Sequence, residues 1–318
     1  MKIDLSIIVL SYNTKDITLS CLSSIVQHTR GLSYEIIVVD NASNDGSSDA
    51  IEEFSHSRPQ VTLIRSAENL GFGRGNNLGA KRAKGEYLLF LNSDTRLTDN
   101  ALNESYEFVI SKPDLGVYSC RLLNEDKSIQ PSGGHFPTLP RLLAWQFFLD
   151  DLPFIGDKFV SIHPHESGFI FLDRFFKSKK RDVVLSESDK HPDWVTGAFM
   201  VIPKKVFKEV GGFDEKIFMY TEEMELAYRI CRLGYKTYFR KSPSIIHLGG
   251  ASGGSYLALS SEVKNMIYFW RKHMPAWQLP IVKMVFFIGS LLRFIIFGII
   301  KGDETYRKAY ARALRYSL

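Results

Sequence analysis

The chain has 318 residues, of which 45% are hydrophobic and 24% are charged. This balance favours a packed core and excludes a largely disordered chain, and the length predicts two domains or one domain with an appendage. A net charge of +5 is too small to predict nucleic-acid binding, but it suits an anionic substrate or an anionic membrane surface. The three cysteines are far apart and form no CxxC motif, so we expect a reducing compartment and neither a disulfide framework nor a structural zinc site.

The first 95 residues alternate between strand and helix patterns. Segments compatible with helices lie at 15–28, 48–56 and 74–84, and Gly85 is a plausible helix stop. The strands are predicted from short apolar runs rich in β-branched residues, at Leu5–Leu10, Glu35–Val39, Val61–Ile64 and Tyr87–Leu91. This order predicts an α/β fold with an open, mostly parallel sheet and right-handed crossovers.

Polar side chains follow three of these strands. They are Ser11, Tyr12 and Asn13 after the first, Asp40 and Asn41 after the second, and Asn92, Ser93 and Asp94 after the fourth. In open α/β sheets, ligands bind beyond the carboxyl ends of the strands. The three clusters therefore predict one shared ligand site.

The segment from about 135 to 193 interrupts the alternation and is rich in proline and aromatic residues. We expect an insertion that covers or lines a site, although irregular packing against the core explains the composition equally well. The regular order resumes near Trp194, with helix signals at Lys204–Val210 and Thr221–Leu233.

The helix predicted at Thr221–Leu233 begins with three acidic residues. Its inward stripe is predicted from Leu226, Ile230 and Leu233. Glu222 and Glu223 border that stripe, where loss of hydration raises the pKa of a carboxyl group and suits it to be a general base. Glu225 points away and has Arg229 four residues later, which predicts an ordinary surface ion pair. The helix dipole alone also favours acids at a helix start.

A glycine-rich stretch, residues 69–79, contains Phe72 and Asn77. Glycine lets a backbone approach a ligand closely, but a turn entering a helix gives the same pattern. The stretch lacks the G-x-G-x-x-G motif with a following acid, so it does not predict a dinucleotide fold.

Two further residues suggest a metal site. Asp94, with Asn92 two residues before it, offers oxygen ligands that suit Mg²⁺ or Mn²⁺ held together with a diphosphate. His247 follows the apolar run Ser244–Ile246 and precedes two glycines. A histidine at a strand end could complete the site, and a structural role for it is as well supported.

These motifs together resemble the family 2 glycosyltransferases of the GT-A fold, of the rhamnosyltransferase-like kind found in bacterial surface-polysaccharide and cell-wall synthesis. The resemblance covers about residues 4–250. It rests on SIIVLSYN at 6–13, VVDNASNDGS at 38–47, NLGFGRGNN at 69–77, LFLNSDT at 89–95 and the long run from Trp194 to Tyr235. It implies a Rossmann-like catalytic domain at 1–255, with a donor half at about 1–120, the aromatic insertion at 135–193 and an acceptor half at about 194–255.

The resemblance also implies roles for these residues. Asp94 would be a metal ligand, His247 a further one, and Mg²⁺ or Mn²⁺ the ion. The usual Y-x-E-D-x-D-L motif reads Tyr220-Thr-Glu-Glu-Met-Glu-Leu226, so Glu223 would be the catalytic base, beside Glu222. A nucleotide-sugar donor would be bound by Ser11, Tyr12, Asn13, Asp40, Asn41, Phe72, Asn77, Asn92 and Ser93.

The implied function is inverting transfer of a sugar, with rhamnose suggested by the resemblance, from a nucleoside-diphosphate sugar to a hydroxyl of a glycan or lipid-linked acceptor. A non-catalytic sugar-binding paralogue is one alternative, because both aspartates of the motif are replaced by glutamate. A nucleotidyltransferase is another, but it would need a basic glycine-rich loop after the first strand, where SYNTKD stands. Nucleic acid is not an expected partner.

The last 60 residues differ in composition. Ile281–Ile300 is almost wholly apolar, with only Lys283 and Arg293 charged, and a basic tail follows. The N-terminus lacks the pattern of a signal peptide. We expect residues 256–318 to form a hydrophobic helical segment that holds a cytoplasmic protein peripherally on the inner face of the cell membrane. A full span and a helix packed on the catalytic domain are the alternatives.

Overall fold

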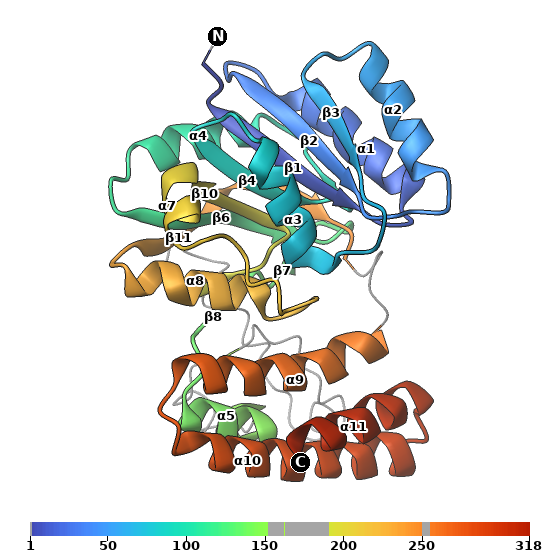
Figure 1. Cartoon of the computed structure of the whole chain (residues 1–318), viewed down its shortest axis with the longest axis vertical. Coiled ribbons are helices and arrows are strands. Elements are labelled where there is room, and N and C mark those ends of the chain that lie inside the picture. The colour runs from blue at the N-terminus through green and yellow to red at the C-terminus, as the bar shows by residue number, and fades with distance from the viewer. Residues whose placement is uncertain (1, 152–161, 163–190, 250–254) are drawn as a thin grey trace. The chain divides into compact units, whose positions relative to one another are not determined.

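The computed structural model of the chain describes residues 2–151, 162, 191–249 and 255–318 (Figure 1). Most of the aromatic segment predicted at 135–193 lies outside the described residues. By internal contacts the chain divides into two compact units. The first holds the described residues of 1–133, 183–218 and 222–252, and the second those of 134–182, 219–221 and 253–318.

The first unit is built on a nine-stranded sheet with the order β3-β2-β1-β4-β10-β6-β11-β5, in which β7 pairs with β6. Strands β1 to β4 are parallel to one another, β10 is antiparallel to both of its neighbours, and β6 and β11 are parallel. The strands are β1 (Leu5–Ser11), β2 (Tyr34–Asp40), β3 (Val61–Arg65), β4 (Tyr87–Asn92), β5 (Thr95–Arg96), β6 (Leu115–Leu123), β7 (Ile129–Gln130), β10 (Phe199–Pro203) and β11 (Lys236–His247). The two-residue strands β8 (Gly133–Gly134) and β9 (Trp194–Val195) lie outside this sheet.

The predicted α/β fold with a mostly parallel sheet is confirmed. All four predicted strands of the first 95 residues are present, each extended by one or two residues at most. The helices of this unit are α1 (Lys15–His28), α2 (Ser47–His56), α3 (Gly71–Arg82), α4 (Ala101–Ile110), α7 (Lys204–Glu209) and α8 (Glu222–Arg232). β1 is buried along most of its length, and Ile7 and Val9 pack into one apolar core with Leu22 and Ile25 of α1. Burial on both faces explains why these strands read as continuous apolar runs.

The glycines of α3 serve close packing. A Cβ atom on Gly75 would lie 2.5 Å from a methyl group of Leu10, and one on Gly79 would lie 2.6 Å from a methyl group of Ile8. Only glycine therefore lets α3 lie this close to β1. At the start of the helix, Gly71 has φ of +74°, and a Cβ there would meet the Phe218 carbonyl oxygen at 2.2 Å. The glycine pattern reflects a turn entering a helix that packs tightly on the sheet.

The second unit is helical. Its elements are α5 (Leu139–Gln146), η1 (Leu149–Asp151), α9 (Ser255–His273), α10 (Gln278–Arg293), the π-helical η3 (Phe294–Ile300) that continues α10, and α11 (Glu304–Ser317). Among the described residues, one helical stretch, Gln278–Ile300, is long enough and apolar enough to cross a membrane, judged by length and composition alone. Within its most apolar window, 39% is buried inside the protein.

Arg293, near the middle of this stretch, is buried. Its guanidinium donates to the carbonyl oxygens of Gln146 at 2.6 Å and Trp145 at 2.7 Å, and lies 4.2 Å from the centre of the Phe148 ring. The charge is therefore held by α5 and the residues that follow it.

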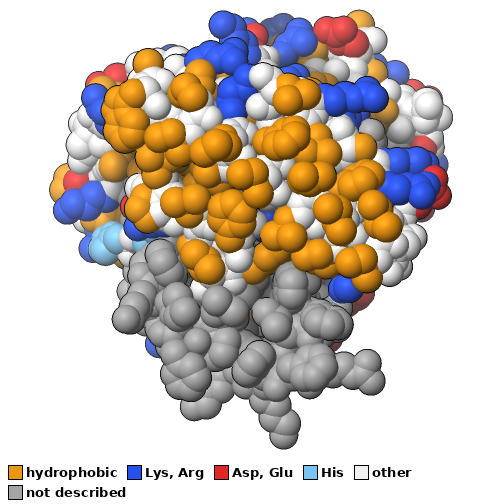
Figure 2. All heavy atoms as spheres, turned by 90° about the horizontal axis from the view of Figure 1, so that it is seen from below, with side chains coloured by type: hydrophobic (Ala, Val, Ile, Leu, Met, Phe, Trp, Pro, Cys, Tyr) orange, Lys and Arg blue, Asp and Glu red, His pale blue; other side chains and the backbone are white. Residues whose placement is uncertain are grey.

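The opposite side of the same stretch is exposed. Figure 2 shows hydrophobic side chains gathered over one broad face, with lysine and arginine side chains along its margin. Exposed apolar side chains recur every three to four residues along α10 and η3, and we call this row the exposed apolar stripe. It consists of Met284, Ile288, Leu291, Ile295 and Ile299. This spacing places them on one face of the helix.

Candidate active site at the carboxyl edge of the sheet

The structure brings the polar ends of β1, β2 and β4 together. In the strand register Ser11 lies opposite Asp40, and Leu10 lies opposite Asn92. β11 reaches the same edge, where His247 pairs with Thr95 of β5. The predicted clusters thus share one edge of the sheet.

The β1 and β2 ends form a polar rim. Asn13, with φ of +53°, donates its backbone N–H to the Ser43 hydroxyl at 2.9 Å, and its side-chain oxygen accepts from Asn44 N–H. Asp40 is 3% exposed, and its Oδ2 accepts the Ser43 N–H at 3.2 Å. Its Oδ1 is buried and has no hydrogen-bond partner among the described residues. This oxygen can accept a hydrogen bond from a ligand.

Four other residues that were predicted to bind the nucleotide-sugar donor already contact other parts of the protein. Ser11 pairs with Thr18 of α1 at 3.0 Å. Asn41 ties β2 to the glycine-rich turn: it accepts from Leu70 N–H and donates to Asn69. Both amide hydrogens of Asn77 go to the 213–215 turn, and the Phe72 ring packs edge-on against Phe213. These side chains shape the edge, and their polar atoms are already engaged.

Asp94 and His247 lie side by side. Asp94 Oδ1 is 3.2 Å from His247 Nε2, and both side chains are largely buried, at 5% and 13% exposure. The Asn92 amide nitrogen is 3.3 Å from the same Nε2, and the buried Ser93 hydroxyl is 3.4 Å from that of Thr14. The Leu248 N–H donates to the Asp94 carbonyl, which fixes this loop against β11.

Gln130 of β7 orients the histidine. Its side-chain oxygen lies 2.6 Å from His247 Nδ1, while its amide nitrogen donates to Asn124. Because an amide oxygen only accepts, Nδ1 carries the hydrogen of this contact, and a neutral ring then has its lone pair on Nε2, the nitrogen that faces the Asp94 carboxylate. An imidazole nitrogen beside a carboxylate oxygen is a donor set that a divalent cation would bridge.

The donor set fits Mg²⁺ or Mn²⁺. No group of three His, Cys, Asp or Glu side chains arranged for a metal occurs within the described part of the chain. Such ions are commonly bound by one or two protein ligands together with substrate phosphates and water. Two side chains at a polar edge are therefore enough for an ion that arrives with a diphosphate.

Glu222 and Glu223 open α8. Glu222 is 3% exposed, and burial, reinforced by the neighbouring Glu223 charge, raises its pKa well above the usual value. The shift favours the protonated form of Glu222. Glu223 is the next residue of the same helix start.

The prediction that Glu225 lies at the surface is wrong. Glu225 is fully buried and accepts from Arg229, with nitrogen–oxygen distances of 2.7 to 2.9 Å. Arg229 also donates to the carbonyl oxygens of Val210 and Gly212. The helix therefore packs on more than one side, which a single inward stripe did not anticipate. Leu233, predicted on that stripe, is 48% exposed because the helix ends at Arg232.

The two residues before α8 have an unusual backbone. Tyr220 has φ of +68° and Thr221 has φ of +82°. The left-handed region is uncommon for residues other than glycine, and β-branched threonine is least suited to it. Such strain costs on the order of 1–3 kcal/mol per residue and persists only where neighbouring contacts impose it. The helix predicted from Thr221 therefore begins one residue later, at Glu222, after this strained turn.

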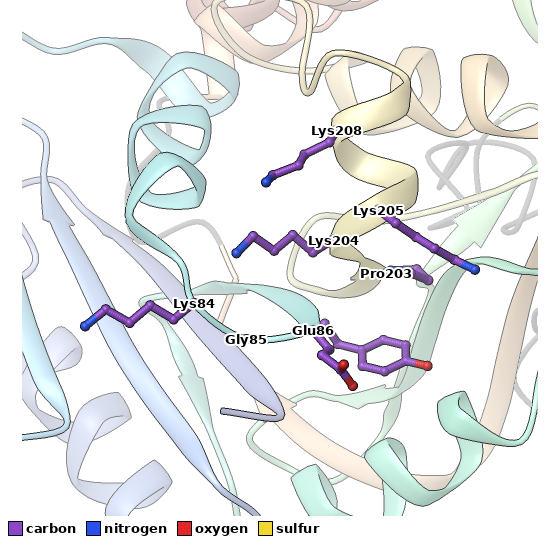
Figure 3. Close-up of a pocket in the computed structure, with 8 residues that line it drawn as sticks. Lys84, Gly85, Glu86, Pro203, Lys204, Lys205 and Lys208 are labelled. Carbon is purple, nitrogen blue, oxygen red and sulfur yellow. The ribbon is translucent and has the colours of Figure 1, made fainter. Parts of the chain in front are cut away.

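A cavity of about 550 Å³ lies elsewhere in the first unit (Figure 3). It is lined near the start of β4 by Lys84, Glu86 and Tyr87, and on the other side by Pro203 at the end of β10 and three lysines of α7, at positions 204, 205 and 208. Figure 3 shows Lys204 and Lys208 extending to one side and Lys205 to the other. Because β4 ends at Asn92, this cavity is at the opposite edge of the sheet, and its positive charge would repel a divalent cation.

Comparison with known proteins identifies the family. The model of glycosyl transferase family 2 matches residues 6–169, and the chain belongs to this family. It is 23% identical over 262 residues to the N-acetylglucosaminyl-diphospho-decaprenol L-rhamnosyltransferase of Mycobacterium tuberculosis, covering 77% of this chain and 78% of the relative. It is 25% identical over 195 residues to the rhamnosyltransferase WbbL of Escherichia coli K12, covering 59% and 64%.

Solved structures agree on the fold. The mannosyltransferase PcManGT from Pyrobaculum calidifontis, solved with GDP-Man and Mn²⁺, has a TM-score of 0.56 at 14% identity, covering 100% of this chain and 86% of that one. GalNAc-T7, solved with UDP, GalNAc and Mn²⁺, has a TM-score of 0.61 at 17% identity, covering 99% and 56%. The chain is thus a glycosyltransferase with the GT-A fold.

Proposed function

We propose that the protein transfers a sugar, with rhamnose as the first candidate, from a nucleoside-diphosphate sugar to a hydroxyl group of a glycan or lipid-linked acceptor, with inversion at the anomeric carbon. The names of two relatives support rhamnose, and the name of the mycobacterial relative supports a lipid-linked acceptor. The observation that carries the proposal is the pair Asp94 and His247, 3.2 Å apart at the edge of the sheet where β1, β2 and β4 end.

The donor would lie along this edge. The buried Asp40 Oδ1, which has no hydrogen-bond partner within the described residues, would accept from a hydroxyl or imide N–H of the nucleoside. Tyr12 and Asn13 follow Ser11, the last residue of β1, which lies opposite Asp40 in the strand register. Asp94 and His247 would hold Mg²⁺ or Mn²⁺ with the diphosphate; when bound, the ion would offset the negative charge that grows on the leaving group.

Glu223 would be the general base. It would remove the proton from the acceptor hydroxyl, whose oxygen then bonds to the anomeric carbon on the face opposite the donor diphosphate. The bond from the anomeric carbon to the diphosphate oxygen breaks, and a nucleoside diphosphate leaves. The raised pKa of Glu222 favours its protonated form, which supports Glu223, the next residue at the start of α8, as the base of the pair.

Sugar transfer can be tested with a panel of nucleotide-sugar donors and with one substitution at the proposed base. Purified full-length protein would be incubated with Mn²⁺, a panel of nucleotide sugars and a lipid extract as acceptor, and the released nucleoside diphosphate would be measured. Glu223→Gln keeps the size of the side chain and removes the proton acceptor, so kcat should fall by roughly 10²–10⁴-fold while donor binding persists. Glu104→Gln, at an exposed position on α4, is the matched control. Donor binding without turnover by the wild type would instead support a non-catalytic sugar-binding paralogue.

We also propose that the exposed apolar stripe attaches the protein to the surface of an anionic membrane. Met284, Ile288 and Ile299 are 44–60% exposed, and a row of this length is more than scattered surface residues explain. The basic side chains of the C-terminal tail, including Lys301, Arg307 and Arg312, are exposed and would gain roughly 1 kcal/mol each near anionic lipid. The burial of Arg293 supports a helix lying in the interface over one that spans the bilayer.

Flotation with lipid vesicles tests this attachment. The full chain should float with vesicles containing phosphatidylglycerol, float less with pure phosphatidylcholine, and be released by high salt or carbonate. Ile288→Asp should abolish flotation, whereas Ile110→Asp, at an exposed position on α4, should not. Wild-type protein that does not float at low salt would exclude the attachment.

A further inference from the structure

The turn that leads into α8, residues 218–221, is held by hydrogen bonds to its carbonyl groups. The backbone N–H of Phe72, at the start of α3, donates to the Phe218 oxygen at 2.8 Å. The next two carbonyls, of Met219 and Tyr220, both accept from the side-chain nitrogen of Asn265, at 2.9 and 2.7 Å. Three consecutive carbonyls are thus fixed before the helix begins.

Asn265 lies on α9 and is 5% exposed. One amide nitrogen has two hydrogens, so it can serve both carbonyls at once. For this to happen the two oxygens must point to the same side, which consecutive carbonyls of an extended strand do not. Positive φ at Tyr220 and Thr221 gives the chain this unusual course. The hydrogen bonds from Asn265 therefore stabilise a backbone conformation of this turn that would otherwise be unfavourable.

We propose that Asn265 is a positioning residue for the acids of α8: its amide holds the strained turn and so fixes where α8 starts and how Glu222 and Glu223 leave the backbone. This rests on the proposed function of Glu223 as base. Without the amide, Tyr220 and Thr221 would relax toward negative φ, and the peptide planes that carry the two glutamates would rotate. Geometry at a reacting centre is sensitive to such displacements.

The first measurement does not need activity. Hydrogen exchange would be followed by mass spectrometry in peptides covering 219–226 of the full chain. Asn265→Leu removes both donors and keeps a side chain of similar size, and Asn265→Ala is a second variant in case the first is poorly folded. Each should raise exchange in these peptides by roughly tenfold or more. Lys264→Ala, at the exposed neighbouring position on α9, should not. Unchanged exchange in both Asn265 variants would overturn the proposal.

The second measurement separates positioning from general stability. In steady-state assays, Asn265→Leu should lower kcat by roughly 10–100-fold and leave KM for the donor nearly unchanged. Glycine adopts positive φ without strain, so adding Thr221→Gly should restore part of the lost kcat. Thr221→Gly alone should have little effect. A double variant no better than Asn265→Leu, or a loss confined to KM, would contradict the positioning role.

The two measurements also distinguish the possible failures. If the wild type transfers no sugar while exchange responds to Asn265 as expected, the turn is held as described and the proposed function is wrong. If the wild type is active and Asn265→Leu matches it in both assays, the function stands and the positioning role is refuted.

Discussion

Replacing Arg293 by Met tests whether the C-terminal hydrophobic stretch is folded into the protein or crosses a bilayer. Methionine has a similar length and suits an apolar environment, so a helix that spans a membrane would gain from the change: a charged residue near the centre costs roughly 2.5–3.5 kcal/mol on insertion scales. In the structure Arg293 is 6% exposed and its nitrogens bond to carbonyl oxygens of Trp145 and Gln146. The folded arrangement therefore predicts the opposite result.

The expected fall in the free energy of unfolding of Arg293→Met follows from the groups that would lose their contacts with the guanidinium. The Gln146 carbonyl oxygen would lose a buried hydrogen bond and the Trp145 carbonyl oxygen a partly buried one, and a group left unsatisfied costs roughly 1–3 kcal/mol. Contact of the guanidinium with the Phe148 ring, 4.2 Å away, would also be lost, at about 1–2 kcal/mol for a desolvated pair. Relief from burying a charge offsets part of this. We expect the free energy of unfolding to fall by about 3 kcal/mol.

Urea unfolding of the full chain in mild detergent measures this change, with Lys308→Met as the control. Lys308 is exposed on α11 and pairs with Glu304 at the surface, so its loss should change stability little. Unchanged or increased stability of Arg293→Met, together with membrane binding that resists carbonate, would refute the folded arrangement and favour a spanning helix.

Three further predictions concern the first unit. EDTA should abolish transfer, and Asp94→Ala should do the same in the presence of Mn²⁺ while Asp99→Ala does not; full activity in EDTA would remove the metal from the proposal. Glu225→Gln should lower the free energy of unfolding by about 3 kcal/mol, because Arg229 loses its buried partner; a change near zero in urea unfolding would contradict this. Glu222 has a raised pKa, so its contribution to stability is complete below pH 4.5 and is lost as the pH rises through the folded-state value. Glu222→Gln lacks this loss, and its stability relative to the wild type should therefore increase from pH 4 to pH 8 in urea titrations; a pH-independent difference would show that the carboxyl group is not buried as described.

The sequence alone determined the parts of this protein that depend on local patterns. Strands buried on both faces read as continuous apolar runs, so β1 to β4 could be placed within one or two residues. Parallel strands joined by right-handed crossovers end at the same edge, which is why Asp40 and Asn92 could be predicted to meet there. Asp94 and His247 are 153 positions apart, but each follows an apolar strand, and that placement suggested their pairing.

Only the tertiary structure decided what the sequence pattern left open. The antiparallel insertion of β10 between β4 and β6 joins segments more than 75 residues apart, and neither strand's composition specifies its neighbour. Glu225 was predicted at the surface because helical periodicity describes one face, whereas burial depends on every element packed around the helix. Arg293 lies in a segment expected to attach to a membrane surface, and only the structure shows its guanidinium buried against α5. Asn265 gave no signal, since an asparagine within a helix is recognised as a clamp only when the carbonyls of the residues before α8 lie beside it. A hydrogen bond between a side chain and backbone that is distant in the sequence depends on the tertiary structure, so local sequence patterns do not predict it.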